Sequence, residues 1–300
     1  MTLPRAARFG IAALSLVAAA TLAGCSPAEH TPTGAPVSLQ VAAAFYPLQY
    51  VAEQVGGTHV AVTALAPPGI EPHDLELSPA GVRSVRSANV VLYLSNFQPS
   101  VDDAIASTGA RALDAASVIA LMPAGDQTEG VLDPHFWLDP TLLSTYATSV
   151  GEEFATLDPQ HADQYRANAS SLVADLGTVN QAYATGLASC ARTTILTSHE
   201  AFGYLAKRYG LTQVGLSGID PEAEPSPARI REVRAIAESS GATTVYVEAL
   251  VDPSVVDAFA HDAHLTVATL DPVESAKGGD DYLTIMNRNL STLEKGLGCA

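Results

Sequence analysis

Four side chains of metal-binding types stand in loops far apart along the chain: His73, His135, His199 and Asp271. Three of these residues follow predicted strands, at residues 60–65, 192–197 and 265–270. The fourth, His135, lies between two Asp-Pro pairs whose prolines restrict the backbone on either side of it. In open parallel sheets ligands collect beyond the carboxyl ends of the strands, so we expect the four side chains to converge.

Three imidazoles and one carboxylate form a complete shell of four ligands for a borderline divalent ion such as zinc. Each half of the chain supplies two of them, which predicts an ion enclosed between two lobes. A site of this composition also binds copper, nickel or cobalt in vitro, so affinity alone does not identify the physiological ion. A closed shell leaves no position for a catalytic water, which favours binding over catalysis.

Other acidic and histidine residues are weaker candidates for metal ligands. Glu248 ends the predicted strand 243–247; it either coordinates the ion directly or holds a ligand histidine by its other ring nitrogen, and the second role is the one we predict. His261 and His264 are spaced i, i+3 on one predicted helix, so the two side chains could bind a metal together. Their presence on an exposed polar helix face is the alternative interpretation. Three further histidines are expected to be solvated: His30, His59 and His161.

A zinc-dependent hydrolase is the alternative from a different class of protein. The nearest approach to a zinc-protease motif starts at His199-Glu200, but its second histidine would have to stand at Gly203. The chain also contains no G-x-S-x-G, P-loop or G-x-G-x-x-G motif. We therefore predict that the protein is not an enzyme.

The N-terminus has the pattern of an export signal. Arg5 and Arg8 precede an uncharged segment, residues 11–23, that is too short to cross a bilayer. The signal peptide, residues 1–24, ends just before Cys25, and the segment Leu22-Ala23-Gly24-Cys25 resembles the lipobox of bacterial lipoproteins, which implies a lipid on Cys25. An ordinary signal peptide with a chance cysteine is the alternative. Residues 25–37, rich in proline, then form a tether, so we expect an extracytoplasmic protein anchored to the cell membrane.

Charge and cysteine content agree with export. The chain has 15 basic and 32 acidic residues, and its formal net charge of −17 argues against nucleic acid as a partner. With Cys25 lipidated, Cys190 and Cys299 remain as an even pair, which predicts a disulfide outside the cytoplasm. Two free buried thiols are the alternative. We expect the protein to be a monomer.

Short β-branched runs alternate with helix signals in both halves of the chain, which predicts an α/β fold with two lobes, each a parallel sheet flanked by helices. The N-terminal lobe covers residues 38–157 and the C-terminal lobe residues 189–300. One long rigid helix at residues 158–188, with Asp158 as N-cap, is expected to connect them. Two helices with a break near Gly177 are the alternative.

Four motifs in order resemble the solute-binding lipoproteins of bacterial ABC importers for zinc and manganese. They are Glu71-Pro72-His73-Asp74, the segment Asp133 to Pro140, Ser198 to Leu211, and Leu270-Asp271-Pro272, and the likeness covers residues 38–297. The resemblance implies two lobes bridged by a rigid helix, with His73, His135, His199 and Asp271 holding the ion, and delivery to a membrane permease.

The identity of the ion depends on two departures from the family pattern. Zinc-type relatives often carry a histidine-rich insertion before the second motif, whereas residues 122–131 are short and contain no histidine. Manganese-type relatives commonly have Glu in place of the third histidine, and here His199 is present. Nitrogen-rich coordination favours zinc, with manganese as the alternative.

The connecting helix is expected to be stiff, which predicts that the ion is released through small movements of a ligand loop. The candidate loop is Pro67-Pro68-Gly69, which leads to His73.

Overall fold

The computed structural model describes residues 37–125, 130–248, 253–276 and 279–300. These residues belong to one compact unit, Ala35–Ala300. The predicted signal peptide, Cys25 and His30 lie outside the described residues, so the lipid anchor remains an expectation. Within the described ranges, no helix is both long and apolar enough for a membrane span.

The N-terminal lobe contains a parallel sheet in the order β2-β1-β3-β4. Ser78 caps α2, because its Oγ accepts a hydrogen bond of 3.2 Å from the backbone N–H of Gly81. The strands are β1 (Leu39–Ala43), β2 (Val60–Ala64), β3 (Val90–Tyr93) and β4 (Ala112–Asp114), and the helices are α1 (Tyr46–Gly56), α2 (Pro79–Ser87) and α3 (Pro99–Thr108).

The C-terminal lobe repeats this topology with a parallel sheet in the order β6-β5-β7-β8. Its strands are β5 (Thr194–Thr197), β6 (Thr212–Gly215), β7 (Thr244–Val247) and β8 (Thr266–Thr269), and its helices are α6 (Gly203–Tyr209), α7 (Pro227–Ser240), α8 (Ser254–Ala263) and α9 (Tyr282–Leu297). The predicted α/β fold of two parallel sheets is confirmed. In each sheet the strand order reverses next to the first strand, which is where open α/β sheets bind ligands.

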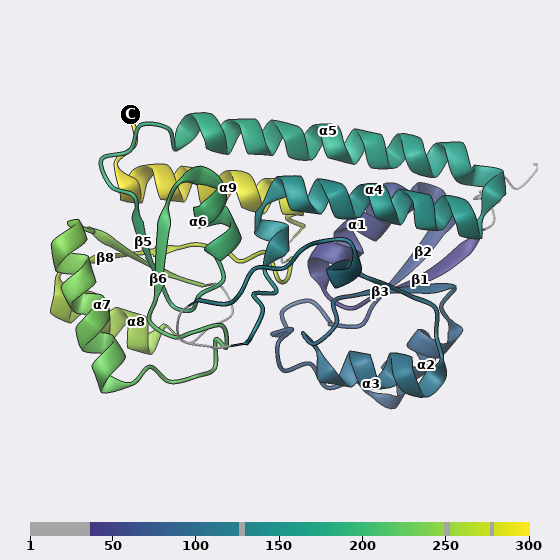
Figure 1. Cartoon of the computed structure of the whole chain (residues 1–300), viewed down its shortest axis with the longest axis horizontal. Coiled ribbons are helices and arrows are strands. Elements are labelled where there is room, and N and C mark those ends of the chain that lie inside the picture. Colours follow the sequence, from purple (N-terminus) through teal and green to yellow (C-terminus); the bar gives the residue numbers. More distant parts are fainter. Residues whose placement is uncertain (1–36, 126–129, 249–252, 277–278) are drawn as a thin grey trace, which may run out of the picture. The chain divides into compact units, whose positions relative to one another are not determined.

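A long helix, α5 (Ala162–Gly186), extends past both sheets, above α4 (Pro140–Leu157) and α9 (Figure 1). It runs through Gly177 without a break, which rules out the two-helix alternative. The predicted start at Asp158 was wrong, because a 3-10 turn, η4 (Pro159–His161), precedes the helix. Asp158 instead accepts hydrogen bonds from the side chains of His161 and Tyr165. Helix α4, which packs along α5, is not among the predicted elements.

The two lobes share one apolar core. A single cluster of buried side chains includes Phe45 just before α1, Trp137 before α4, Tyr183 on α5 and Tyr282 at the start of α9. A second, smaller cluster fills the outer part of the C-terminal lobe. Because rotating one lobe against the other would expose the shared cluster, this packing opposes a wide hinge movement.

The predicted disulfide is present. Cys190, just after α5, is bonded to Cys299, just after α9, across a sequence separation of 109 residues. The bond ties the C-terminal end of the long helix to the end of the chain. The alternative of two free thiols is thereby excluded.

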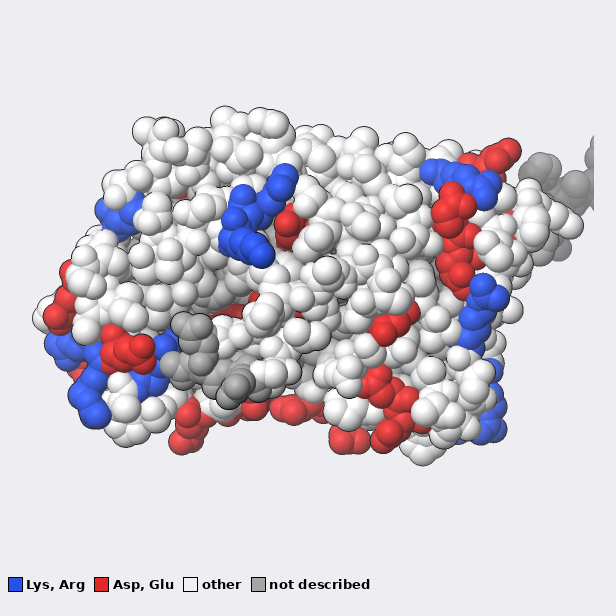
Figure 2. Space-filling model, in the orientation of Figure 1, with Lys and Arg blue, Asp and Glu red and all other residues white. Residues whose placement is uncertain are grey.

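The surface reflects the acidic composition. Figure 2 shows carboxylates gathered along the lower edge of one face, with fewer basic side chains elsewhere on it. This distribution agrees with the formal net charge of −17.

Candidate metal-binding site

Four side chains drawn from both lobes place one donor atom each within 4.8 Å of all the others: His73, His135, His199 and Glu274. His135 and His199 are fully buried, and Glu274 is only 3% exposed. The side chain of His73 is slightly more open, at 11%. The described residues hold no second group of this kind.

The spacing of the donor atoms fits a tetrahedral ion. Nε2 of His73 lies 3.3 Å from Nε2 of His135, and the two nitrogens lie 3.4 Å and 3.2 Å from Oε1 of Glu274. A tetrahedral zinc with bonds of about 2.0–2.1 Å would separate its ligand atoms by about 3.3–3.4 Å. Charge-assisted hydrogen bonds between nitrogen and carboxylate oxygen are usually shorter, about 2.7–2.9 Å. The three atoms therefore lie at the spacing of ligands around an ion.

His135 is held by the backbone turn that precedes it. Oδ1 of Asp133 accepts a hydrogen bond of 2.9 Å from the backbone N–H of His135. The same oxygen lies 2.8 Å from Nδ1 of the His135 ring. The 3-10 turn η3 (Phe136–Leu138) follows at once and packs the indole of Trp137 against the imidazole, with ring centroids 5.2 Å apart. Because Nδ1 is engaged by Asp133, Nε2 is left as the donor toward the cluster.

His199 follows β5 and is held by Glu248, which follows β7. Oε2 of Glu248 is in ion-pair contact with Nδ1 of His199. Oε1 of Glu248 accepts hydrogen bonds from the Ser198 hydroxyl, at 2.6 Å, and from the backbone N–H of His199, at 3.2 Å. Nε2 of His199 is buried and has no hydrogen-bond partner among the described residues. A buried imidazole nitrogen without a partner is costly unless a ligand takes its lone pair.

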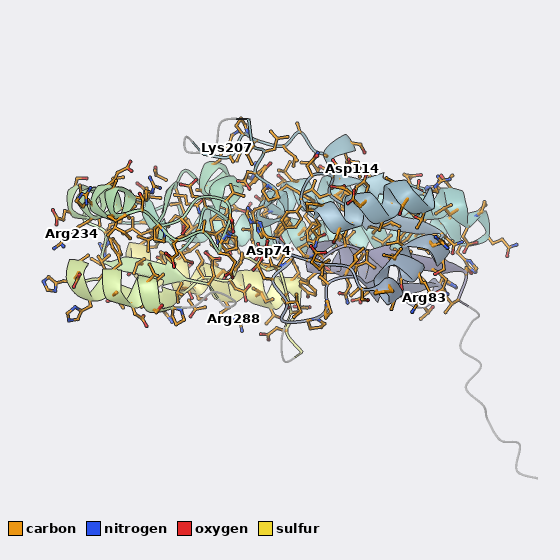
Figure 3. The ribbon with its side chains drawn as sticks, turned by 90° about the horizontal axis from the view of Figure 1, so that it is seen from below. Asp74, Arg83, Asp114, Lys207, Arg234 and Arg288 are labelled. Carbon is orange, nitrogen blue, oxygen red and sulfur yellow. A yellow bond between two sulfur atoms is a disulfide. The ribbon has the colours of Figure 1, made fainter. Side chains whose placement is uncertain are left out.

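His73 lies on the solvent side of the cluster. Its loop is fixed by Gln98, whose Nε2 donates to the carbonyl of Pro72 at 3.0 Å. The neighbouring Asp74 is exposed, and Figure 3 places it between the helices of the two lobes. A cavity of about 420 Å³ is lined by His73, Phe97, Leu132 and Ile219, among others. An ion that enters from this side would meet His73 first.

The carboxylate in the cluster is Glu274, where the sequence predicted Asp271. Asp271 follows β8 as expected, but its Oδ1 accepts a hydrogen bond of 2.8 Å from the backbone N–H of Val273. This Asx turn is a common role for Asp before Pro, and the turn signal was available in the sequence. The turn brings Glu274 into the cluster.

The electrostatics of the cluster favour positive charge. Burial by itself lowers the pKa of His135, but Asp133 and Glu274 outweigh it and raise the pKa to about 10. For His199, burial is outweighed in the same way by Glu248, so its pKa is raised. Burial lowers the pKa of His73. Burial would raise the pKa of Glu274, but hydrogen bonds from His135 and His73 hold it well below the usual range.

The remaining histidines lie elsewhere. His261 is 88% exposed, and neither it nor His264 belongs to the cluster. His59 and His161 were expected to be solvated. Instead they are half-buried and stack on each other, with ring centroids 3.9 Å apart. The stack lies where η1 (Gly57–His59) meets η4.

The fold and the cluster together define a class: a two-lobed α/β protein with a buried, nitrogen-rich site suited to a divalent cation. More specifically, the chain belongs to the ZnuA family, described as zinc-uptake complex component A, periplasmic, which matches residues 41–296. That description is of an uptake component and agrees with the prediction that the protein is not an enzyme.

Curated relatives include the zinc-binding lipoprotein AdcA of Streptococcus pneumoniae, 28% identical over 277 residues and 86% of this chain. The chain spans only 55% of the length of that relative. The high-affinity zinc uptake system protein ZnuA of Bacillus subtilis is 28% identical over 309 residues, and the match covers 96% of both chains.

Solved structures share the fold over nearly their whole length. The laminin-binding adhesin Lmb of Streptococcus agalactiae superposes with a TM-score of 0.81 at 30% identity, covering 86% of this chain and 99% of the other. The Zn(II)-bound ZnuA-like domain of AdcA from Streptococcus pneumoniae gives a TM-score of 0.75 at 28% identity, covering 87% and 99%.

Proposed function

We propose that this protein captures a divalent transition metal, zinc in preference to manganese, and delivers it to an ABC importer in the membrane. His73, His135, His199 and Glu274 are the proposed ligands. The observation that carries the proposal is the spacing of the donor atoms, 3.2–3.4 Å between the nitrogens of His73 and His135 and the oxygen of Glu274. The unpartnered Nε2 of His199 supports it.

The choice of zinc rests on ligand chemistry. Three neutral imidazoles and one carboxylate are donors that suit zinc, whereas manganese prefers more oxygen ligands. With four ligands from the protein the shell is closed, so the site is suited to holding an ion rather than to activating a water molecule. The names of the zinc-binding relatives point the same way.

Metal content tests the ligand set. We expect the purified protein to hold one equivalent of zinc. Replacement by alanine should lower zinc affinity by more than about 10–100-fold, the loss typical when a residue that only hydrogen-bonds to a ligand is removed. The positions to replace in turn are His73, His135, His199 and Glu274. His261→Ala, which removes an exposed histidine outside the cluster, is the matched control and should bind like the wild type. Full zinc binding by Glu274→Ala together with loss in Asp271→Asn would restore the assignment of Asp271 as the ligand.

Delivery and anchoring need cells. We expect deletion of the gene to lower zinc accumulation in zinc-poor medium, the wild-type chain to restore it, and His135→Ala to fail to restore it at equal protein level. Cys25→Ser should release the protein from the membrane fraction while leaving zinc binding intact. Restoration of zinc accumulation by His135→Ala would contradict the transport role.

A further inference from the structure

Val273, the residue before Glu274, has a backbone conformation that is rare for its type. Its φ is +62°, in the left-handed region, and its side chain is fully buried. For a β-branched residue such a φ is an outlier, because Cβ crowds the neighbouring carbonyl. Conformations of this kind persist only where the surrounding structure enforces them. The contacts of the segment 271–275 show what enforces this one.

The first restraint is a pair of residues, Asp271 and Asn289. The backbone N–H of Asp271 donates to Oδ1 of Asn289 at 2.9 Å, and Nδ2 of Asn289 donates to the carbonyl of Asp271 at 2.6 Å. Oδ1 of Asp271 then accepts the N–H of Val273 at 2.8 Å. Asn289 lies on α9 and is 1% exposed, so the turn is fixed to a buried point of the helix.

Further restraints join the segment to two of the histidine loops. Nε1 of Trp137, two residues after His135, donates to the carbonyl of Pro272 at 2.8 Å. The backbone N–H of Gly69, in the loop that leads to His73, donates to Oγ of Ser275 at 2.6 Å. The segment is thus held on both sides of Val273.

A cavity lies beside the segment 271–275. A cavity of about 340 Å³ is lined by Asp271, Glu274, Ser275, Asp280, Arg288 and Asn289. Arg288, labelled in Figure 3, pairs there with Asp280 at 2.8 Å. The side chain of Glu274 itself is only 1% exposed, so it has little freedom to point elsewhere once the backbone turn before it is set.

We propose that Asp271 is a positioning residue: with Asn289 it holds Val273 in the left-handed conformation and so aims Glu274 at the cation. The proposal rests on the proposed function, since it concerns the same site. The role of Asp271 in this proposal is to accept the N–H of Val273 through its side-chain oxygen, which does not require a negative charge. An amide at this position should therefore serve as well as the carboxylate.

The test compares Asp271→Ala with Asp271→Asn, using Co²⁺ and Zn²⁺ alone as probes and the unfolding midpoint of the metal-free chain as a check on folding. We expect Asp271→Ala to weaken Co²⁺ binding at least about tenfold and to change the visible Co²⁺ spectrum, because water replaces the carboxylate. Asp271→Asn should keep the wild-type spectrum and bind within about threefold of the wild type, because the amide oxygen still accepts the N–H of Val273.

The outcomes separate the two proposals. If the wild type and His261→Ala bind no Co²⁺ or Zn²⁺, the proposed function fails and this inference fails with it. If the wild type binds but Asp271→Ala matches it, or Asp271→Asn loses as much affinity as Asp271→Ala, only the positioning role is overturned. Should Asp271→Ala not fold, Asn289→Ala takes its place: the spectral change supports the role and a wild-type spectrum overturns it.

Discussion

Trp137 and Pro272 are joined by a hydrogen bond of 2.8 Å from the indole Nε1 to the proline carbonyl. The bond links the N-terminal lobe, where Trp137 follows His135, to the segment of the C-terminal lobe that carries Glu274. Tyr282 adds a second link, because its hydroxyl donates to the carbonyl of Trp137 at 2.6 Å. Two proposed ligands from opposite lobes thus depend on one buried indole.

Replacing the indole with a ring that lacks the donor should loosen this link. In Trp137→Phe the buried carbonyl of Pro272 loses its partner, which should lower the free energy of unfolding by about 1–3 kcal/mol. Zinc affinity should fall as well, because the segment of Glu274 becomes less well fixed. Urea unfolding of the metal-free protein and a competition titration with a zinc chelator measure the two effects. An unchanged affinity would show that the bond serves stability only.

The carboxylate behind His199 should matter although it is outside the cluster. Glu248→Gln removes the negative charge beside Nδ1 of His199 and makes the ring a poorer donor, so zinc affinity should fall about 10–100-fold. The exposed Glu53→Gln is the matched control. A loss confined to folding stability, with affinity retained, would contradict this role.

Zinc affinity should rise with pH. In the metal-free protein burial disfavours protonation of His135, but Asp133 and Glu274 raise its pKa to about 10, and the pKa of His199 is also raised. Binding requires neutral rings and displaces these protons, so affinity should rise about tenfold per pH unit for each proton released. Calorimetry in buffers of different ionisation enthalpy counts the protons. Binding without proton release would contradict the prediction.

The stability of the metal-free protein should follow the opposite trend. A histidine whose pKa is raised on folding stabilises the folded state fully below its unfolded pKa, about 6.5, and loses this contribution as the pH rises through the folded value. For His135 the loss should extend from pH about 6.5 to the folded pKa of about 10. Urea unfolding of the metal-free chain across this range is the measurement, with His135→Asn as the variant that should lack the trend.

The disulfide should support folding without touching the site. It closes a loop with a sequence separation of 109 residues, for which the loop-entropy model gives about 4–5 kcal/mol. Replacing both Cys190 and Cys299 by serine should therefore lower the melting temperature markedly and leave zinc stoichiometry at one. A change in the visible spectrum of bound Co²⁺ would show that the bond also shapes the site.

Metal release should involve a loop rather than a lobe. The shared core that includes Trp137 and Tyr282 opposes rotation of one lobe, whereas His73 is the most exposed of the proposed ligands. We expect hydrogen exchange in residues 67–75 to slow on zinc binding, with an unchanged radius of gyration by small-angle scattering. A large change in that radius would contradict a loop mechanism.

Much of the fold was predictable because local chemistry marks it. Ser78 and Ser226 cap helices that begin with Pro79 and Pro227, and Gly210 and Gly241 end helices in the left-handed conformation that glycine adopts without cost. The start of α5 was not predictable, since Asp158-Pro159 suits a 3-10 turn as well as an α-helix N-terminus. Choosing between the two depends on tertiary contacts of His161 and Tyr165.

The three histidines, the two-lobed α/β fold and the cysteine pair could be predicted from the amino-acid sequence, because strand ends, proline turns and residue counts are local features. The carboxylate of the cluster could not be predicted in this way, because its position depends on contacts between distant parts of the chain. Asp271 and Glu274 are three residues apart, and a turn between them sends one side chain to a backbone N–H and the other to the histidines. That turn is hydrogen-bonded to Asn289, on α9 of the same lobe, and to Trp137 of the N-terminal lobe, which reaches it only when the lobes pack together.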